Sequence, residues 1–215
     1  MALIVNVFQF NGFQENTYLV SNDSGETLIF DPGCYSREEE LLLSDFIEEN
    51  KLTICAVLYT HAHIDHILGA EFVREKYQCA SYLHPLDHVT WNSVANYAHV
   101  YGFEGYKSSA LPEIFLEDRQ ELHIGDFKIQ VRHTPGHSPG HVIFYFDADN
   151  FIINGDVLFR ESFGRVDLPG GDLNTLKNSI FDVMFNLPDD TRVYFGHGAP
   201  TSIADEKKDN YILTF

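Results

Sequence analysis

The chain has 215 residues, of which 44% are hydrophobic and 21% charged, and its formal net charge is −18. This length and composition suit an ordinary globular protein, and we expect a single domain over residues 1–215. The acidic surface repels phosphate backbones, which argues against nucleic acid as a substrate. No apolar run approaches the roughly 20 residues needed to span a bilayer, so no membrane partner is expected.

The N-terminus and the cysteines predict a cytoplasmic location. Residues 1–5 have no basic flank and no cleavage site, and they run directly into strand-like sequence, so no signal peptide is expected. Cys34, Cys55 and Cys79 are odd in number and lack motif spacing, which fits a reducing compartment and packing roles for all three. The sequence leaves the oligomeric state open.

The first quarter of the chain predicts strands followed by a helix. Strands are expected at 3–10, 17–21 and 27–30, the last two joined by a turn at 22–25. The helix covers 36–49, with Ser36 as N-cap and Glu39 completing a capping box. Residues 54–59 form an apolar strand, and helical apolar spacing predicts a helix from about His66 to Tyr77.

The middle of the chain is rich in aromatic residues. After a strand at 80–83, a helix is expected at 85–97 and an irregular loop up to residue 112. Two interpretations are open for this segment, a lid or wall over the active site and an aromatic helix packed on the core. The predicted elements that follow are strands 127–132, 142–146 and 151–153, helix 173–185 with Asp172 as N-cap, strand 192–195 and a final helix from 202.

Four potential metal ligands lie within six residues directly after the strand at 54–59. In an extended segment residues two apart share a face, so His61 and His63 can reach one ion together. Asp65 and His66 are adjacent and share a face only if the chain turns into the predicted helix. The first pair would then serve one ion and the second pair a neighbouring one.

Three more potential ligands also follow predicted strands. His137 comes after strand 127–132, Asp156 after strand 151–153 and His197 after strand 192–195. Because binding crevices form at such strand ends in α/β sheets, these loops are expected to converge. His133 and His141 flank His137 and are alternative ligands. The other histidines, His84, His88, His99 and His123, are expected to be surface or lid residues. His84 or His88 could also line a substrate pocket.

Residues 61–66 read H-x-H-x-D-H and resemble the signature of the metallo-β-lactamase superfamily, most closely its small glyoxalase II-like hydrolases. Six other segments stand in the family's order: 13–18, 31–33, 134–141, 155–159, 164–171 and 196–198. The resemblance implies an α/β fold, the metallo-β-lactamase αββα sandwich, in which two mixed β-sheets are flanked by helices.

The resemblance also assigns the ligands. It implies that His61, His63 and His137 bind one metal, that Asp65, His66 and His197 bind the second, and that Asp156 bridges the two. Asp31 resembles the family's aspartate that supports the ligands from beneath the metals. Oxygen and nitrogen donors without a thiolate suit two Zn²⁺ ions, with Fe or Mn as alternatives.

This ligand set predicts a metal-dependent hydrolase acting on a small molecule. A metal-bridging hydroxide, oriented by Asp65 as the catalytic residue, would attack a carbonyl. The resemblance points to a thioester such as S-lactoylglutathione or a related acyl thiol. The larger glyoxalase II enzymes carry a C-terminal helical domain that this chain does not match, so glutathione contacts would come from elsewhere, such as Lys107 or Arg160. The alternatives are a persulfide dioxygenase with a single iron, and a hydrolase of another ester or lactone.

Overall fold

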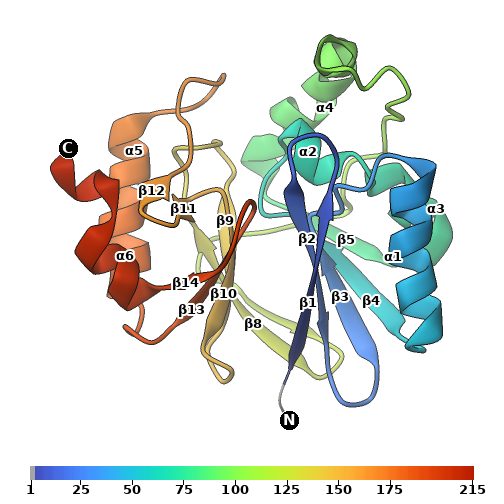
Figure 1. Ribbon diagram of the computed structural model, residues 1–215, viewed down its shortest axis with the longest axis horizontal. Helices are drawn as coiled ribbons and strands as arrows, with labels where there is room; N and C mark the ends of the chain where they lie inside the picture. The colour runs from blue at the N-terminus through green and yellow to red at the C-terminus, as the bar shows by residue number, and fades with distance from the viewer. Residues whose placement is uncertain (1–2) are drawn as a thin grey trace. The chain divides into compact units, whose positions relative to one another are not determined.

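The computed structural model describes residues 3–215, which form two compact units (Figure 1). Unit 1 contains the described residues up to Phe115 together with Ile124–Asp126, and unit 2 contains Leu116–His123 and Phe127–Phe215. Each unit is built around one six-stranded sheet and is described by itself. That residues 1–215 form one domain stays a prediction.

The sheet of unit 1 joins antiparallel and parallel strands. Strands β1, β2 and β3 pair antiparallel, and β3, β4, β5 and β6 pair parallel in that order. The parallel register sets Phe30 opposite Leu58, so the segments that follow β3 and β4 leave the same sheet edge. The bounds are Ile4–Phe10, Glu15–Ser21, Glu26–Phe30, Thr53–Leu58, Ala80–Leu83 and Ile114–Phe115.

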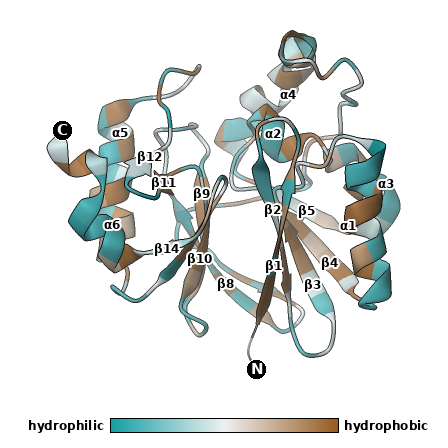
Figure 2. Ribbon diagram, in the orientation of Figure 1, coloured by the Kyte–Doolittle hydropathy of each residue, from teal (hydrophilic) through white to brown (hydrophobic). Residues whose placement is uncertain are grey.

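Helix α1, Arg37–Glu49, begins where the sequence predicts. Glu39 N donates to Ser36 Oγ at 3.2 Å and Ser36 N donates to Glu39 Oε2 at 3.1 Å, which is the predicted capping box. The helix buries Leu43 and Ile47 in the core of unit 1 and carries acidic residues on its other side, and its ribbon alternates between apolar and polar colours (Figure 2).

The helix predicted from His66 to Tyr77 is two helices, α2 (Ile64–Ile67) and α3 (Ala70–Tyr77). The break occurs because Gly69 N donates to Pro32 O at 2.8 Å, a partner outside the helix. A Cβ on Gly69 would lie 2.4 Å from Cys34 Sγ, so glycine allows this close approach. The ligand segment therefore turns earlier than predicted, at Ile64.

The aromatic segment contains three short helices, η1 (Pro85–Asp87), α4 (His88–Tyr97) and η2 (Ala98–Tyr101). Trp91 and Phe103 are buried in the core of unit 1, and Tyr97 and Tyr106 pack against that core. The core-packing interpretation therefore describes most of this segment. Among the Phe, Tyr and Trp side chains of this segment Tyr101 is the exception, with 50% of its surface exposed.

The sheet of unit 2 has the strand order β14-β13-β10-β9-β8-β7. Its central strands β9 and β10 are fully buried, and β10 pairs parallel with β13. The two-residue strands β11 and β12 form a separate hairpin, and strands this short carry no periodicity that a sequence can display. The bounds are Glu121–Ile124, Phe127–His133, Val142–Phe146, Phe151–Gly155, Leu158–Phe159, Ser162–Phe163, Arg192–Phe195 and Thr201–Ser202.

The helix predicted over 173–185 changes its winding along its length. Asp172 is its N-cap as predicted, and regular α-helix α5 covers Leu173–Asn178. A π-helical stretch η3, Ser179–Val183, and a 3-10 turn η4, Met184–Asn186, follow. This winding keeps the core residues Leu176, Ile180 and Met184 fully buried.

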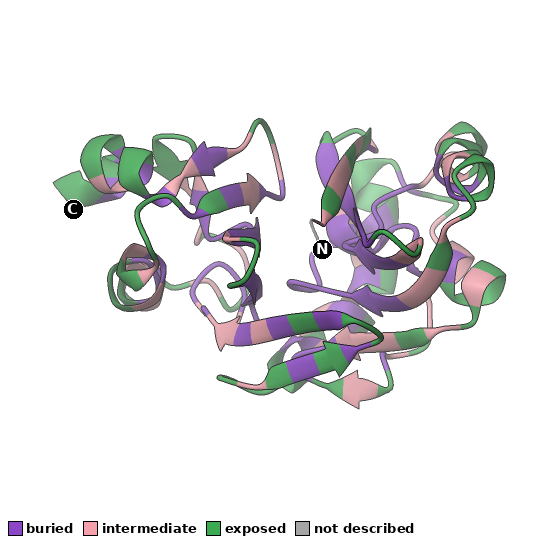
Figure 3. Ribbon diagram, turned by 90° about the horizontal axis from the view of Figure 1, so that it is seen from below, coloured by how far each residue is buried: buried purple, intermediate pink, exposed green. Residues whose placement is uncertain are grey.

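The chain ends with helix α6, Ile203–Asp209, capped by Ser202, and with the 3-10 turn η5, Tyr211–Thr214. In Figure 3 the helices show both buried and exposed residues, as expected for helices that cover a sheet. Within residues 3–215 no helix is both long and apolar enough to cross a bilayer.

Candidate metal centre

The histidine loop, residues 60–66, follows β4 in unit 1 and is almost completely buried. His61 and His66 are 0% exposed and His63 is 8% exposed. The ring centroids of His61 and His63 are 4.7 Å apart, and those of His61 and His66 are 4.1 Å apart. The structure thus brings the three histidines of the motif together within unit 1.

Asp31 lies beneath this loop, at the end of the neighbouring strand β3. Its Oδ1 accepts a hydrogen bond from Thr60 N at 2.7 Å, and its Oδ2 accepts one from Thr60 Oγ1 at 2.6 Å. His66 Nδ1 lies 3.1 Å from the same Oδ2. Asp31 has a φ of 48°, a costly conformation for a residue other than glycine. This cost is offset by the three contacts that the carboxylate makes.

These contacts determine which nitrogen of each imidazole carries the lone pair. A carboxylate only accepts, so His66 Nδ1 must donate to Asp31. The single hydroxyl proton of Thr60 goes to Asp31, so the hydroxyl oxygen accepts from His61 Nδ1 at 3.0 Å. In both neutral rings the Nε2 atom is then the available ligand atom.

Asp65, the predicted catalytic residue, is held by the turn between β1 and β2. Asn11 Nδ2 donates to the Asp65 carbonyl oxygen and to the Gly33 carbonyl oxygen, both at 3.0 Å. The Asp65 carboxylate keeps 14% of its side-chain surface exposed, and its Oδ2 lies 3.7 Å from His66 Nε2. This carboxylate is therefore less buried than the histidines around it.

Glu15 is a buried carboxylate near the histidine loop that was not predicted as a site residue. It is 0% exposed, and a Cβ on Gly33 would lie 2.0 Å from its Oε2. Burial raises the pKa of Glu15 well above its ordinary value, although His66 lowers it and the carboxylates of Asp31 and Asp65 raise it further. Strand β2 is buried at every position but begins with the three polar residues Glu15, Asn16 and Thr17, so no apolar pattern in the sequence marks Glu15 as buried.

Glu15→Gln is expected to change how the stability of the metal-free protein depends on pH. The folded state holds the Glu15 proton to a higher pH than the unfolded chain, whose pKa is about 4.3. Stability of the wild type is therefore lost as pH rises from that value through the raised folded-state pKa, and the neutral glutamine removes this loss. Urea unfolding between pH 5 and 9 measures it, with exposed Glu75→Gln as control. Parallel curves for wild type and Glu15→Gln would contradict the expectation.

Asp87 is a second buried carboxylate that no sequence pattern indicated. It is 0% exposed, and its Oδ2 accepts a hydrogen bond from Ala62 N at 2.8 Å. Ala62 lies between His61 and His63, so Asp87 fixes the backbone in the middle of the histidine loop.

In unit 2 the three remaining predicted ligands meet at one edge of the sheet. The parallel register sets Gly155 opposite Phe195, and Gly196 N donates to Gly155 O at 2.7 Å. Asp156 and His197 follow these two strand ends directly. The Oδ2 atom of Asp156 lies 3.4 Å from His137 Nε2 and 3.7 Å from His197 Nε2.

The environment of His137 differs from that of the two histidines beside it. His137 Nδ1 donates to the Arg165 carbonyl oxygen at 2.8 Å, which leaves the lone pair on Nε2 facing Asp156. His141 Nε2 instead accepts from Asp156 N at 3.0 Å, and His133 Nε2 donates to the Pro139 carbonyl at 2.9 Å. In His133 and His141, the alternative ligands, Nε2 therefore has a backbone partner. In His137 the same atom faces the Asp156 carboxylate.

Arg165 and Asp167 pair with each other on the surface. Arg165 Nε and Nη2 donate to the two Asp167 oxygens, each at 2.7 Å. This bidentate hydrogen bond lowers the pKa of Asp167 to about 2. The pair shapes the loop whose carbonyl holds His137.

Gly164→Ala is expected to destabilise unit 2 at this point. A Cβ at residue 164 would lie 1.9 Å from the Asp156 carbonyl oxygen and 3.0 Å from His137 Nδ1. Since the nearest obstacle is backbone, we expect a loss of about 3 kcal/mol in unfolding free energy. Urea unfolding measures this, and Gly12→Ala is the control because a Cβ there meets nothing within 4 Å. Equal stability of the two variants would show that the loop adapts.

The C-terminal segment anchors the β11–β12 hairpin beside His197. The buried Glu206 accepts hydrogen bonds from Glu161 N at 2.9 Å and from Asn210 Nδ2 at 2.7 Å. Asn210 Nδ2 also lies 3.2 Å from the Phe159 carbonyl oxygen. The Phe159 ring in turn contacts the His197 ring, with centroids 6.0 Å apart.

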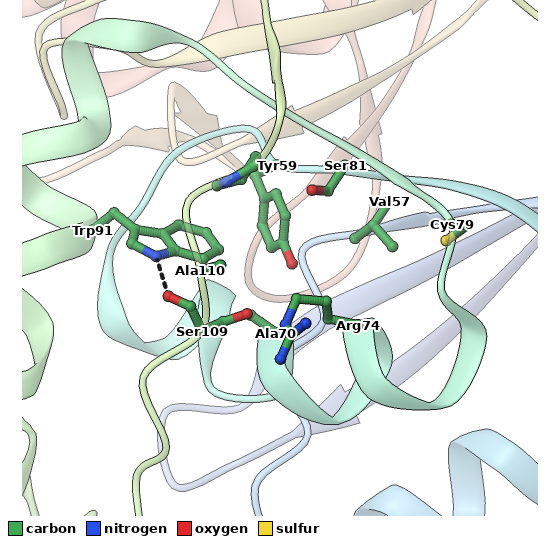
Figure 4. A pocket seen from close by; sticks show the side chains of 10 residues that line it. Val57, Tyr59, Ala70, Arg74, Cys79, Ser81, Trp91, Ser109 and Ala110 are labelled. Atoms are coloured by element: carbon green, nitrogen blue, oxygen red, sulfur yellow. Dashed lines mark hydrogen bonds between the residues drawn. The ribbon is translucent and has the colours of Figure 1, made fainter.

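A pocket in unit 1 lies behind the histidine loop, between the end of β4, helix α3 and residues 109–112 (Figure 4). Tyr59 and Trp91 meet edge to face at 5.0 Å, and Trp91 Nε1 donates to Ser109 O at 3.2 Å. None of the predicted metal ligands lines this pocket. Its contacts support the aromatic core under the loop.

The other histidines and the cysteines lie in varied surroundings. His123 is exposed and pairs with Glu121 at 2.8 Å, and His99 is exposed. The expectation of a surface or lid position is wrong for His84, which is buried because its side chain caps η1. All three cysteines are free thiols, and burial raises the pKa of Cys34.

A family comparison identifies the class of protein that this fold and these residues define. The Metallo-beta-lactamase superfamily domain matches residues 10–197. The chain therefore belongs to the metallo-β-lactamase superfamily and is a metallo-hydrolase. The predicted superfamily and the predicted fold class are confirmed.

Two relatives are similar over nearly the whole chain. Probable metallo-hydrolase YqgX of Bacillus subtilis (strain 168) is 38% identical over 201 residues, which cover 93% of this chain and 92% of that protein. Hydroxyacylglutathione hydrolase GloC of Haemophilus influenzae is 31% identical over 210 residues, which cover 97% of each.

Solved structures with this fold carry different descriptions. BLEG-1 B3 metallo-beta-lactamase is 35% identical, with a TM-score of 0.91, over 99% of this chain and all of that one. TTHA1623 in a di-iron-bound form is 37% identical, with a TM-score of 0.85, over 96% and 98%. ETHE1 from Myxococcus xanthus is 25% identical, with a TM-score of 0.77, over 97% and 83%. The similar structures thus include a lactamase and an iron protein.

Proposed function

We propose that this metallo-hydrolase cleaves an acyl thioester, such as S-lactoylglutathione or a related acyl thiol, with two divalent metal ions. His61, His63 and His137 would hold one ion, Asp65, His66 and His197 would hold the other, and Asp156 would be a ligand of both. The superfamily domain matches residues 10–197 and so includes all seven of these residues, which supports this assignment.

The observation that carries the metal part of the proposal is the fixed orientation of three imidazoles. His61, His66 and His137 each direct Nδ1 at an oxygen acceptor, so Nε2 is the ligand atom in each. The donors are nitrogen and oxygen without a thiolate, which fits Zn²⁺ and also Fe or Mn. TTHA1623, the di-iron-bound protein similar to this chain, supports iron as the alternative to zinc.

Divalent ions, when bound, lower the pKa of water and polarise a carbonyl. The carboxylate of Asp65 would orient the attacking water and accept its proton. This carboxylate is partly exposed, so a water molecule can reach it. Asp31 would act through His66 and Thr60 by holding the ligands in place. The three free cysteines fit the cytoplasmic location that forms part of the proposal.

The substrate class is supported by GloC and by the chemistry of the leaving group. GloC, a hydroxyacylglutathione hydrolase by name, aligns along 97% of this chain. A thiolate leaves without a general acid because its parent pKa is near 8.5, whereas an amine must be protonated. The proposal assigns no separate acid among the seven ligands.

The test is a parallel assay on purified protein of measured metal content. The substrates are S-lactoylglutathione, glutathione persulfide and a cephalosporin. Thiol release from the thioester without oxygen uptake, with two metal ions per chain, is the expected result. If only the cephalosporin ring is opened, the substrate is a lactam and not a thioester, as the name of BLEG-1 suggests for that protein.

A persulfide dioxygenase with a single iron is the second candidate, favoured by the similarity to ETHE1. Oxygen uptake with glutathione persulfide and one iron per chain would establish it in place of the hydrolase. The full set of ligands for a second metal, including His66 and His197, favours the hydrolase.

A further inference from the structure

Two aromatic residues are exposed together on unit 1, although they are 88 positions apart in the chain. Phe13 is 41% exposed at the turn between β1 and β2, and Tyr101 is 50% exposed at the end of η2. Their ring centroids are 5.7 Å apart, and Phe13 also contacts the buried Phe103 at 5.8 Å. We call Phe13 and Tyr101, which lie over Phe103, the aromatic patch.

The aromatic patch is directly linked to the histidine loop within the same unit. Phe13 N donates to Asn11 Oδ1 at 2.9 Å, and Asn11 Nδ2 donates to the Asp65 carbonyl oxygen at 3.0 Å. A single side chain therefore connects the backbone of Phe13 with that of Asp65. The Phe13 turn therefore lies against the backbone of Asp65.

Tyr97 gives a second link from the other side of the patch. Its ring centroid lies 5.9 Å from that of Tyr101. Burial, together with the nearby charge of Asp65, raises the pKa of Tyr97 to about 12. Phe13 thus contacts Asn11, and Tyr101 contacts Tyr97. Both Asn11 and Tyr97 lie near Asp65.

The Phe13 turn is held in place, which suits a binding wall rather than a loose surface loop. Asn11 and Gln14 adopt φ values of 53° and 57°, and Asn11 N donates to Glu39 Oε1 at 2.7 Å. Gln14 N closes the turn on the Asn11 carbonyl at 3.2 Å. The turn that carries the exposed ring of Phe13 is therefore fixed against the backbone of Asp65.

We propose that the aromatic patch binds an apolar acyl group of the substrate, so that the enzyme prefers thioesters of medium-chain or aryl acids to those of small polar acids. This inference rests on the proposed thioester hydrolysis and names its acyl specificity. The patch consists of aromatic rings and contains no basic side chain, and the chain has a net charge of −18. The patch therefore does not attract an anionic group. Contact with apolar carbon is what such rings provide.

The test compares thioesters of one thiol, N-acetylcysteamine, with acetyl, butyryl and hexanoyl groups. Each fully buried methylene is worth about fourfold, and contact with one wall gives part of that. We expect kcat/KM of the wild type to rise at least about tenfold from acetyl to hexanoyl. In Phe13→Ser/Tyr101→Ser this ratio should fall to within about twofold. A wild-type ratio near one would overturn the inference.

Val89→Ser is the matched control, because Val89 is 80% exposed on α4 and belongs to no part of the aromatic patch. It should keep the wild-type ratio. Sedimentation of the double variant addresses a second occupant, another copy of this chain. A loss of self-association combined with an unchanged acyl preference would assign the patch to an interface and contradict the proposal.

Binding of non-hydrolysable thioethers separates this inference from the proposed function. S-hexyl- and S-ethyl-N-acetylcysteamine are titrated by NMR against the wild type and the double variant. Tighter binding of the hexyl compound, lost in the double variant, supports the patch even if no thioester is cleaved. Thioester cleavage without any hexyl preference would leave the proposed function intact and overturn the inference.

Discussion

Asp156→Ala is expected to lose at least one metal ion per chain and to lower kcat/KM by on the order of a thousandfold or more. The Asp156 carboxylate lies within 3.7 Å of ligand atoms on both His137 and His197, so its removal takes away the proposed bridge. Metal content by mass spectrometry and thioester hydrolysis measure the two effects.

The fold should survive this substitution. Asp156 N still donates to His141 Nε2, and Asn154 still holds the turn through Leu158. Asp182→Ala, which removes an exposed carboxylate in the same unit, is the control for the loss of one negative charge. An unchanged metal content in Asp156→Ala would count against the bridging role.

Asp31→Asn is expected to weaken metal binding by about 10- to 100-fold, the range for partners of metal-ligating histidines. Asparagine has the shape of aspartate and tolerates the φ of 48° at this position. Its Oδ1 can keep the hydrogen bond from Thr60 N. The NH₂ group that replaces Oδ2 cannot accept the hydrogen bonds that Thr60 Oγ1 and His66 Nδ1 donate there. Competition with a chelator measures the affinity.

Saturating metal distinguishes a positioning role for Asp31 from a catalytic one. If Asp31 acts through His66 and Thr60, excess metal should restore most of the activity of Asp31→Asn. Asp45→Asn, an exposed position on α1, is the control and should bind metal as the wild type does. Activity that stays low at full metal occupancy would mean that Asp31 takes part in the chemistry itself.

Local features of the fold were readable from the sequence because both partners lie a few residues apart. The capping box of Ser36 and Glu39 and the N-cap Asp172 are such cases, since each depends on one turn of chain. The break at Gly69 was not readable. It depends on the Pro32 carbonyl and on Cys34, more than thirty residues earlier in the chain.

The aromatic segment shows the same limit. Its composition allowed both a lid and a core helix, because aromatic rings suit either environment. Tertiary packing buried Trp91 and Phe103 and left Tyr101 exposed beside Phe13. A contact between a β-turn and a helix end 88 residues away has no local signature.

The sequence by itself determined the superfamily, the strand ends that carry the candidate ligands, and the ligands that the family pattern names. Spacing and order along the chain are enough for those, because a motif is a local arrangement of donor types. Only the tertiary structure decided how each donor is oriented and which groups lie behind it. Asp31 under Thr60 and His66, and the buried Glu15 and Asp87, depend on distant segments meeting within unit 1, and the Arg165 carbonyl at His137 depends on such a meeting within unit 2. Burial and hydrogen bonding there fix protons and side chains.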